Sequence, residues 1–152
     1  MGELEQPLSA AGIGADACVA ALCALAALWT IALVVVDSRQ RRLPDVLTLP
    51  AAGIAVIACF LAPAGWVGVI WPLGYLMLGP GIGGGDVKLA LPLGVALALV
   101  GGVVTVFAGM LIASLFTVVN LLLKGEKSAA HGPSMLAAAW IVGLASTFLV
   151  PV

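Results

Sequence analysis

The sequence predicts an all-α, polytopic membrane protein with about six transmembrane helices and both termini outside the cytoplasm. Its composition points to a membrane protein, because 63% of the 152 residues are hydrophobic and only 9% are charged, whereas soluble domains are nearer half apolar and a quarter charged. Long uncharged runs divide the chain, and every Lys and Arg lies beside the end of such a run. We expect a single membrane-embedded domain, residues 1–152, with no separate soluble domain.

The uncharged runs give the expected helices in order, because a spanning helix needs roughly 17–25 apolar residues. The expected helices cover residues 17–36, 46–62 and 65–79, two segments within 89–123, and 135–150. The run 89–123 is too long for one span, and Gly101 and Gly102 are the expected turn because glycine accepts a tight reversal of the backbone. The first run is interpreted as a retained span and not a signal peptide, since no Lys or Arg precedes it.

The basic residues give the expected orientation. With six helices all of them fall on one side of the membrane, namely Arg39, Arg41, Arg42, Lys88, Lys124 and Lys127. The positive-inside rule makes this side cytoplasmic. We therefore expect a multi-pass protein of the cell inner (plasma) membrane whose arginines hold anionic lipid. The net charge of -1 gives no indication of nucleic-acid binding, and no nucleic-acid partner is expected.

Two aspartates are expected at the same depth, on the cytoplasmic side. Asp37 ends the first predicted helix, and Asp86 begins the fourth behind a run of glycines. If their helices pack together the carboxylates can meet, and a close pair shares a proton because both cannot easily ionise. Such a pair can activate water and polarise a carbonyl, which is the chemistry of aspartic peptide hydrolysis. Gly83 and Gly85 would let an extended peptide approach the backbone.

Other roles remain open for the same charged residues. Asp37 could be an interfacial charge paired with a nearby arginine, and Asp86 could cap its helix. Asp45 is expected to be a cap or an arginine partner. Lys88 is expected to be an interfacial anchor, with a role in setting the charge of Asp86 as the second hypothesis. No metal or cofactor is expected, because the three cysteines and the single histidine show no metal-ligand spacing.

Three segments resemble motifs of one family. GGGDVKL, which begins at Gly83, fits the G-x-G-D pattern of membrane aspartyl proteases and is similar to the second motif of the type IV prepilin peptidases. VVDSRQRRLPDVLTLP, Val35 to Pro50, resembles the first motif of that family. HGPSMLA is similar to the aromatic-Gly-Pro segment that opens the last helix, with His131 in place of the aromatic residue. The resemblance covers most of the chain from about Val34 onward.

The resemblance implies an aspartic-type endopeptidase that cleaves the leader of prepilin-like membrane proteins at the cytoplasmic face. By motif position, Asp37 and Asp86 would be the catalytic pair, and Gly83, Gly85 and Lys88 are the candidates for substrate binding. The chain looks like the minimal form of tight-adherence pilus systems, without the cysteine-bearing insertion of larger members, so methyltransferase activity is not implied. Pilus or secretion assembly proteins are possible partners. Two alternatives stay open: an ion- or proton-coupled transporter, and a non-catalytic assembly subunit.

The helix ends suggest separate roles for the two carboxylates. Asp37 lies at the C-terminal end of its helix, where the helix dipole is negative, and Asp86 lies at an N-terminal end, where the dipole is positive. On this basis Asp86 is expected to be the ionised base at rest, and Asp37 to hold the shared proton.

Overall fold

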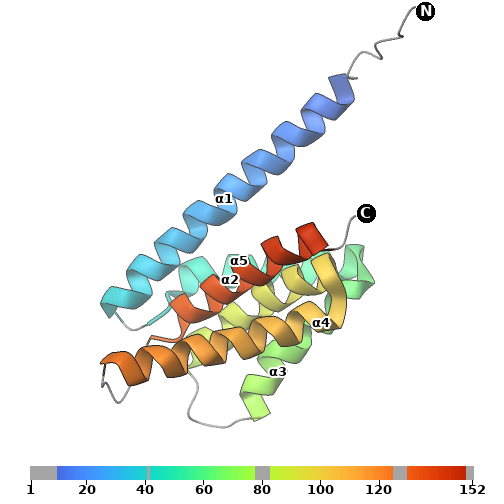
Figure 1. The fold of residues 1–152 in the computed structure, drawn as a ribbon. Coiled ribbons are helices and arrows are strands. Elements are labelled where there is room, and N and C mark those ends of the chain that lie inside the picture. The colour runs from blue at the N-terminus through green and yellow to red at the C-terminus, as the bar shows by residue number, and fades with distance from the viewer. Residues whose placement is uncertain (1–9, 41, 78–82, 125–129, 150–152) are drawn as a thin grey trace, which may run out of the picture. The chain divides into compact units, whose positions relative to one another are not determined.

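The computed structural model describes residues 10–40, 42–77, 83–124 and 130–149 (Figure 1). Within these ranges the chain is helical and has no strand, which confirms the all-α prediction. By its internal contacts the chain divides into two units, Met1–Ala32 and Leu33–Val152, and helix α1, Ala10–Gln40, runs through the boundary. The described part of the first unit is one uninterrupted helical segment.

The helices of the second unit follow the predicted order. After α1 come α2 (Asp45–Leu61), the 3-10 helix η1 (Pro63–Val69) continuing into α3 (Ile70–Met77), α4 (Gly84–Lys124) and α5 (Gly132–Leu149). The predicted starts of α1 and α4, at residues 17 and 89, are late, because these helices begin before the uncharged runs do. The predicted ends at residues 79 and 150 lie outside the described residues.

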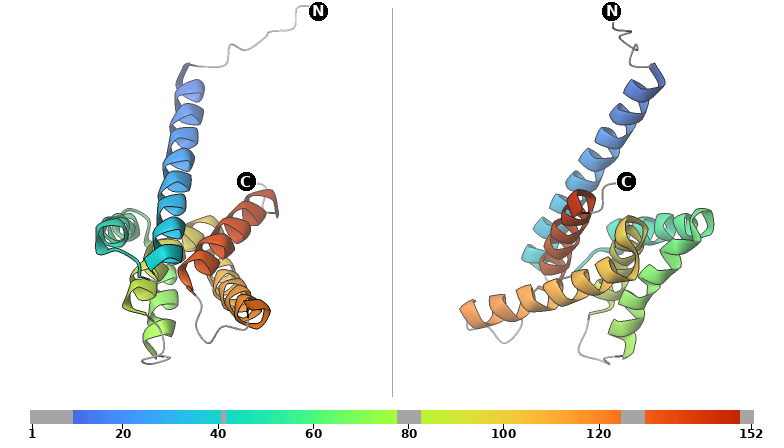
Figure 2. Two further views of the ribbon diagram at one scale, coloured as in Figure 1. Left: turned by 90° about the vertical axis from the view of Figure 1, so that its left-hand side faces the viewer. Right: turned by 45° about the vertical axis from the view of Figure 1, so that its right-hand side comes forward.

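Helix α4 is two helices joined by a reversal at the predicted glycines. Gly101 (φ -151°, ψ 20°) and Gly102 (φ 67°, ψ -152°) leave the helical geometry, and glycine adopts the positive φ without strain. The Thr105 hydroxyl donates to the Leu97 carbonyl oxygen at 2.6 Å, although the residues are 8 apart in sequence. A straight helix would separate them by about 12 Å. The second half of α4 therefore returns beside the first, as the yellow and orange ribbons in Figures 1 and 2 show.

Glycines let η1 and α3 lie directly on the α4 hairpin. A Cβ atom built on Gly68 would overlap the backbone of Gly94, and one built on Gly94 would overlap the Gly68 carbonyl oxygen. Just beyond this crossing, the fully buried Trp71 packs against Gly94 in one half of α4 and Gly109 in the other. These contacts fix the η1–α3 segment across both halves of the hairpin.

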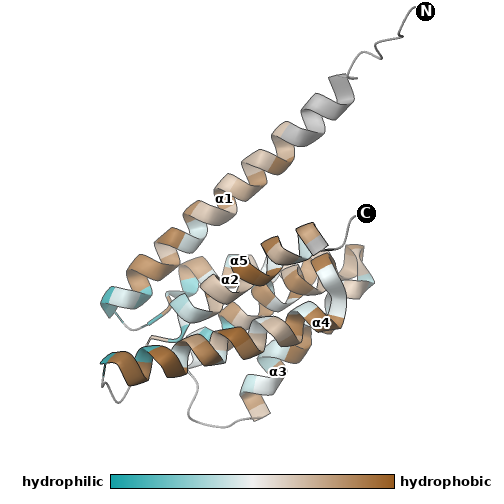
Figure 3. Ribbon diagram, in the orientation of Figure 1, coloured by the Kyte–Doolittle hydropathy of each residue, from teal (hydrophilic) through white to brown (hydrophobic). Residues whose placement is uncertain are grey.

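The hydrophobic surface of the helices supports a membrane location. Two helical stretches, Ala17–Gln40 and Gly84–Lys124, are long and apolar enough to cross a membrane by length and composition, and Asp45–Leu61 and Gly132–Phe148 are shorter apolar helices. Figure 3 shows hydrophobic colouring along most of the helices, with hydrophilic residues where α1 ends and α2 begins. The number of spans and the side of the termini stay predictions.

Candidate active site

The structure brings Asp37 and Asp86 together within the second unit. Asp37 lies near the end of α1, and Asp86 lies in the first turn of α4. The Asp37 carboxylate lies close enough to Asp86 for its charge to act on the Asp86 carboxylate. Asp37 is only 5% exposed, and its Oδ2 atom is buried and has no hydrogen-bond partner in the part of the chain that the structure describes. A buried polar atom without a partner costs free energy, so this arrangement calls for a functional explanation.

Asp86 is held at the start of α4 by the backbone of Gly83. The Gly83 carbonyl oxygen accepts the Asp86 N–H at 3.0 Å, and the Gly83 amide interacts with the Asp86 carboxylate. Gly83 occupies the N-cap position, because α4 begins at Gly84. Asp86 is therefore the third helical residue and reaches back to the N-cap amide, as in a capping box. The expected stabilising role at the helix start thus coexists with the pairing to Asp37.

Asp37 lies against the start of α5. A Cβ atom built on Gly132 would lie 2.6 Å from Asp37 Oδ2, and the Gly132 amide interacts with the carboxylate, although Oδ2 itself lacks a hydrogen bond of full geometry. The positive N-terminus of α5 therefore faces Asp37. The prediction that helix ends separate the roles of the two aspartates considered only the helix to which each residue belongs, and it stays a prediction.

Leu43, in the connection between α1 and α2, fills the space beside Gly85 and Gly132. A Cβ atom built on Gly85 would lie 2.9 Å from Leu43 Cβ, and one built on Gly132 would lie 3.5 Å from Leu43 Cδ1. Gly84, by contrast, has nothing within 4 Å of its Cβ position. A Leu43 side chain therefore covers Gly85 in this structure, and substrate binding at Gly83 and Gly85 stays a prediction.

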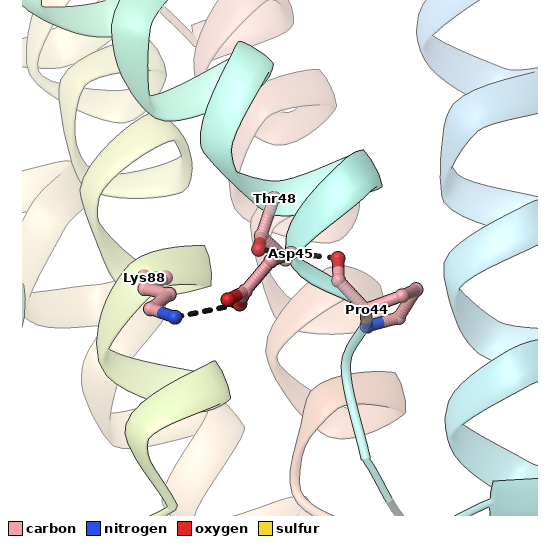
Figure 4. A network of polar contacts seen from close by, with 4 residues as sticks. All are labelled: Pro44, Asp45, Thr48 and Lys88. Carbon is pink, nitrogen blue, oxygen red and sulfur yellow. Dashed lines mark hydrogen bonds and ion pairs between the residues drawn. The ribbon is translucent and has the colours of Figure 1, made fainter.

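Lys88 is paired with Asp45, as Figure 4 shows. The Lys88 Nζ atom lies 2.6 Å from Asp45 Oδ1, which joins the start of α4 to the start of α2. The Thr48 hydroxyl donates to the Pro44 carbonyl oxygen one turn away at 3.3 Å. Among the described residues, the ion-pair partner of Asp45 is therefore a lysine and not one of the expected arginines. The roles of Lys88 as an interfacial anchor and in substrate binding stay predictions beside this ion pair.

The arginines near Asp37 do not neutralise it within the described residues. Arg39 and Arg42 are exposed and form no ion pair with Asp37 there. Arg41 lies outside the described residues. The alternative that Asp37 is a simple surface charge is at odds with its burial.

A histidine network beside the aspartates was not predicted. The Tyr75 hydroxyl lies 2.7 Å from His131 Nε2, and the Thr117 hydroxyl lies 2.6 Å from His131 Nδ1. Tyr75 is 4% exposed and lies within the field of Asp86. Burial lowers the pKa of His131, so the ring is neutral at pH 7. The available sequence signal was the single histidine of the chain, placed directly before Gly132 and Pro133.

The arrangement suits acid–base chemistry by the two carboxylates. The partnerless Oδ2 of Asp37 can accept a hydrogen bond from water, and two neighbouring carboxylates can hold one proton between them. Among the described residues no group of three or more His, Cys, Asp or Glu side chains could hold a metal ion.

Comparison with known families agrees with this geometry. The model of the type IV leader peptidase family matches residues 24–118, which is more than half of the chain and includes both Asp37 and Asp86. No curated protein and no solved structure matches the chain. The chain belongs to the type IV leader peptidase family.

Proposed function

We propose that this protein is a membrane aspartyl endopeptidase that removes the leader peptide of prepilin-like membrane proteins, with Asp37 and Asp86 as the catalytic pair. Membership of the type IV leader peptidase family supports the leader-peptidase activity. The observation that carries the assignment to this pair is the buried, partnerless Oδ2 of Asp37 beside a second carboxylate. A purely structural aspartate would be expected to satisfy both of its oxygens.

In the proposed reaction the two carboxylates share one proton. The ionised carboxylate takes a proton from a water molecule, and the neutral one donates a hydrogen bond to the carbonyl oxygen of the scissile peptide. Water attacks the carbonyl carbon, and the tetrahedral intermediate collapses when a proton reaches the leaving nitrogen. Because Leu43 covers Gly85, a peptide that approaches this glycine has to displace the Leu43 side chain.

The charge distribution supports a site at the cytoplasmic face of the inner membrane. Arg39 and Arg42 flank the end of α1, and Lys88 lies near the start of α4. The reversal within α4 returns Lys124 toward the same end of the hairpin. The positive-inside rule assigns this end to the cytoplasm. The exposed arginines can also hold anionic lipid, at about 1 kcal/mol each near a charged surface.

The transporter alternative is less well supported. Transport sites with intramembrane carboxylates lie near the midplane of the membrane, between repeated halves. Here both carboxylates lie near helix ends, and the family match favours a peptidase. A non-catalytic assembly subunit differs from the peptidase only in activity, so the experiment has to measure cleavage.

The test is incubation of the purified protein with candidate prepilin-like proteins, followed by mass spectrometry of the products. We expect the wild type to release the leader, and Asp37→Asn and Asp86→Asn to lose at least about 100-fold in rate, since each acid–base group contributes roughly 10²–10⁴. Asp45→Asn is the matched control, because Asp45 pairs with Lys88 at an exposed position and is expected to retain activity. A folded Asp86→Asn protein that cleaves at the wild-type rate would refute the assignment.

A further inference from the structure

Both ring nitrogens of His131 are bound by side chains from other helices. Tyr75 comes from α3 and contacts Nε2, and Thr117 comes from the second half of α4 and contacts Nδ1. The Tyr75 and His131 rings also pack against each other, with centroids 5.5 Å apart and planes at 57°. His131 therefore connects α3 and α4 to the start of α5.

The hydrogen bonds assign the tautomer of the ring. The Thr117 hydroxyl donates to the Ala113 carbonyl oxygen at 3.0 Å, which uses its only proton. It must then accept from His131, so the proton of the neutral ring lies on Nδ1. Nε2 is left as an acceptor, and the Tyr75 hydroxyl donates to it. In this direction each of the three protons has an acceptor, whereas the reverse direction leaves the Ala113 carbonyl without the Thr117 proton.

The neighbours of His131 face both carboxylates: Gly132 lies beside Asp37, and Tyr75 lies near Asp86. Its carbonyl oxygen accepts the Met135 N–H at 3.1 Å, which makes it the first acceptor of α5. The next residue, Gly132, is the one that lies against Asp37 Oδ2. Its ring partner Tyr75 lies within the field of Asp86. A movement of the His131 ring would thus shift the groups that face both aspartates.

We infer that His131 is a positioning residue for the aspartate pair, and that its Nδ1-protonated ring, held between Tyr75 and Thr117, fixes the start of α5 on Asp37. The inference rests on the proposed peptidase function. It assigns His131 no contact with substrate, so loss of the ring's hydrogen bonds should lower kcat and leave KM unchanged.

Three substitutions separate the two hydrogen bonds. His131→Phe keeps a ring and removes both bonds, His131→Gln carries an amide to the Nε2 position, and His131→Asn carries one to the Nδ1 position. We expect kcat to fall by about 10- to 100-fold in His131→Phe, because small misplacements of catalytic groups cost up to roughly 100-fold. The Gln and Asn proteins should each recover part of this loss. Thr117→Val removes the hydroxyl that contacts Nδ1. Ser114→Ala is its matched control, since the Ser114 hydroxyl also donates to the carbonyl oxygen four residues earlier in α4 but lies at an exposed position.

A spectroscopic readout tests the network without any activity. His131 is the only histidine of the chain, so a protein purified without a histidine tag and labelled with ¹⁵N-histidine gives one imidazole spectrum. We expect the Nδ1–H tautomer, with the Nε2 resonance shifted by Tyr75→Phe and the Nδ1 resonance shifted by Thr117→Val. An Nε2–H tautomer would overturn the inference, as would a folded His131→Phe protein with the kcat of the wild type. A wild type that cleaves no prepilin-like protein would instead refute the proposed function, whatever the tautomer.

Discussion

Glycines are in contact with different groups in two regions of this molecule, the crossing of η1 with α4 and the site around the two aspartates. At the crossing, Gly68 and Gly94 bring backbone against backbone, and a Cβ atom on either residue would overlap the main chain of the other. At the site, Gly85 and Gly132 meet side chains, and what fills the space of the missing Cβ atoms is Leu43 and the carboxylate of Asp37.

The difference separates the requirements of the fold from those of the chemistry. Main chain cannot rotate away as a side chain can, so a Cβ atom at the crossing could be accommodated only by a shift of a whole helix. A side chain can rotate away, so the site could tolerate a Cβ atom at the expense of the carboxylate position. Substitution by alanine should therefore damage stability at the first region and catalysis at the second.

The largest effect is expected for Gly68→Ala. The added methyl group would meet the backbone of Gly94, and overpacking of this kind costs about 1–3 kcal/mol or more, a large part of the stability of a domain. We expect a lower thermal unfolding temperature in detergent and a lower yield of folded protein. Gly53→Ala is the control, because nothing lies within 4 Å of its Cβ position and alanine favours a helix interior by about 0.5–1 kcal/mol. Equal unfolding temperatures of the two variants would contradict the close backbone contact between Gly68 and Gly94.

A smaller effect on stability and a larger one on catalysis are expected for Gly132→Ala. The methyl group would lie 2.6 Å from Asp37 Oδ2 and would push the carboxylate away from the α5 amides. We expect a folded protein whose cleavage rate falls by about 100-fold, as for other displaced catalytic groups. Rates of leader cleavage and unfolding temperatures, measured on the same preparation, test this. An unfolded Gly132→Ala protein would show that Gly132 is required for folding, as Gly68 and Gly94 are, and would contradict a specific effect on catalysis.

The smallest effect is expected for Gly85→Ala compared with Gly84→Ala. Only the Gly85 methyl group would approach Leu43, at 2.9 Å from its Cβ atom, so only this variant should slow cleavage. Leu43→Gly in the same protein should restore part of the rate, because it removes the Leu43 Cβ atom that the new methyl group would approach most closely. Equal rates for Gly84→Ala and Gly85→Ala would show that the contact between Leu43 and Gly85 has no bearing on the site.

Part of this arrangement could be predicted from the sequence. The reversal at Gly101 and Gly102 was predictable, because an uncharged run too long for one span needs a turn where the backbone is least restricted. The meeting of Asp37 and Asp86 was predictable from their positions at helix ends of equal expected depth, together with the motif resemblance. Both inferences rest on patterns that are local in the sequence.

The remaining contacts were not predictable in this way. The ion pair of Lys88 with Asp45 and the burial of Gly85 under Leu43 join segments that are far apart in the chain. Which side chains meet there depends on how each helix is rotated and where the helices cross, and hydropathy patterns do not specify this. The contact of Asp37 with the start of α5 has the same origin, and it places a second helix end beside this carboxylate.

The central claim is that Asp37 and Asp86 act as one catalytic unit. The most direct measurement is the rate of leader cleavage by Asp37→Asn, Asp86→Asn and the double variant, on one prepilin-like substrate and with folding verified for each. Groups that act as a unit are non-additive, so the double variant should be no slower than the slower single variant. A double variant whose loss equals the product of the two single losses, or a single variant with the wild-type rate, would contradict the claim.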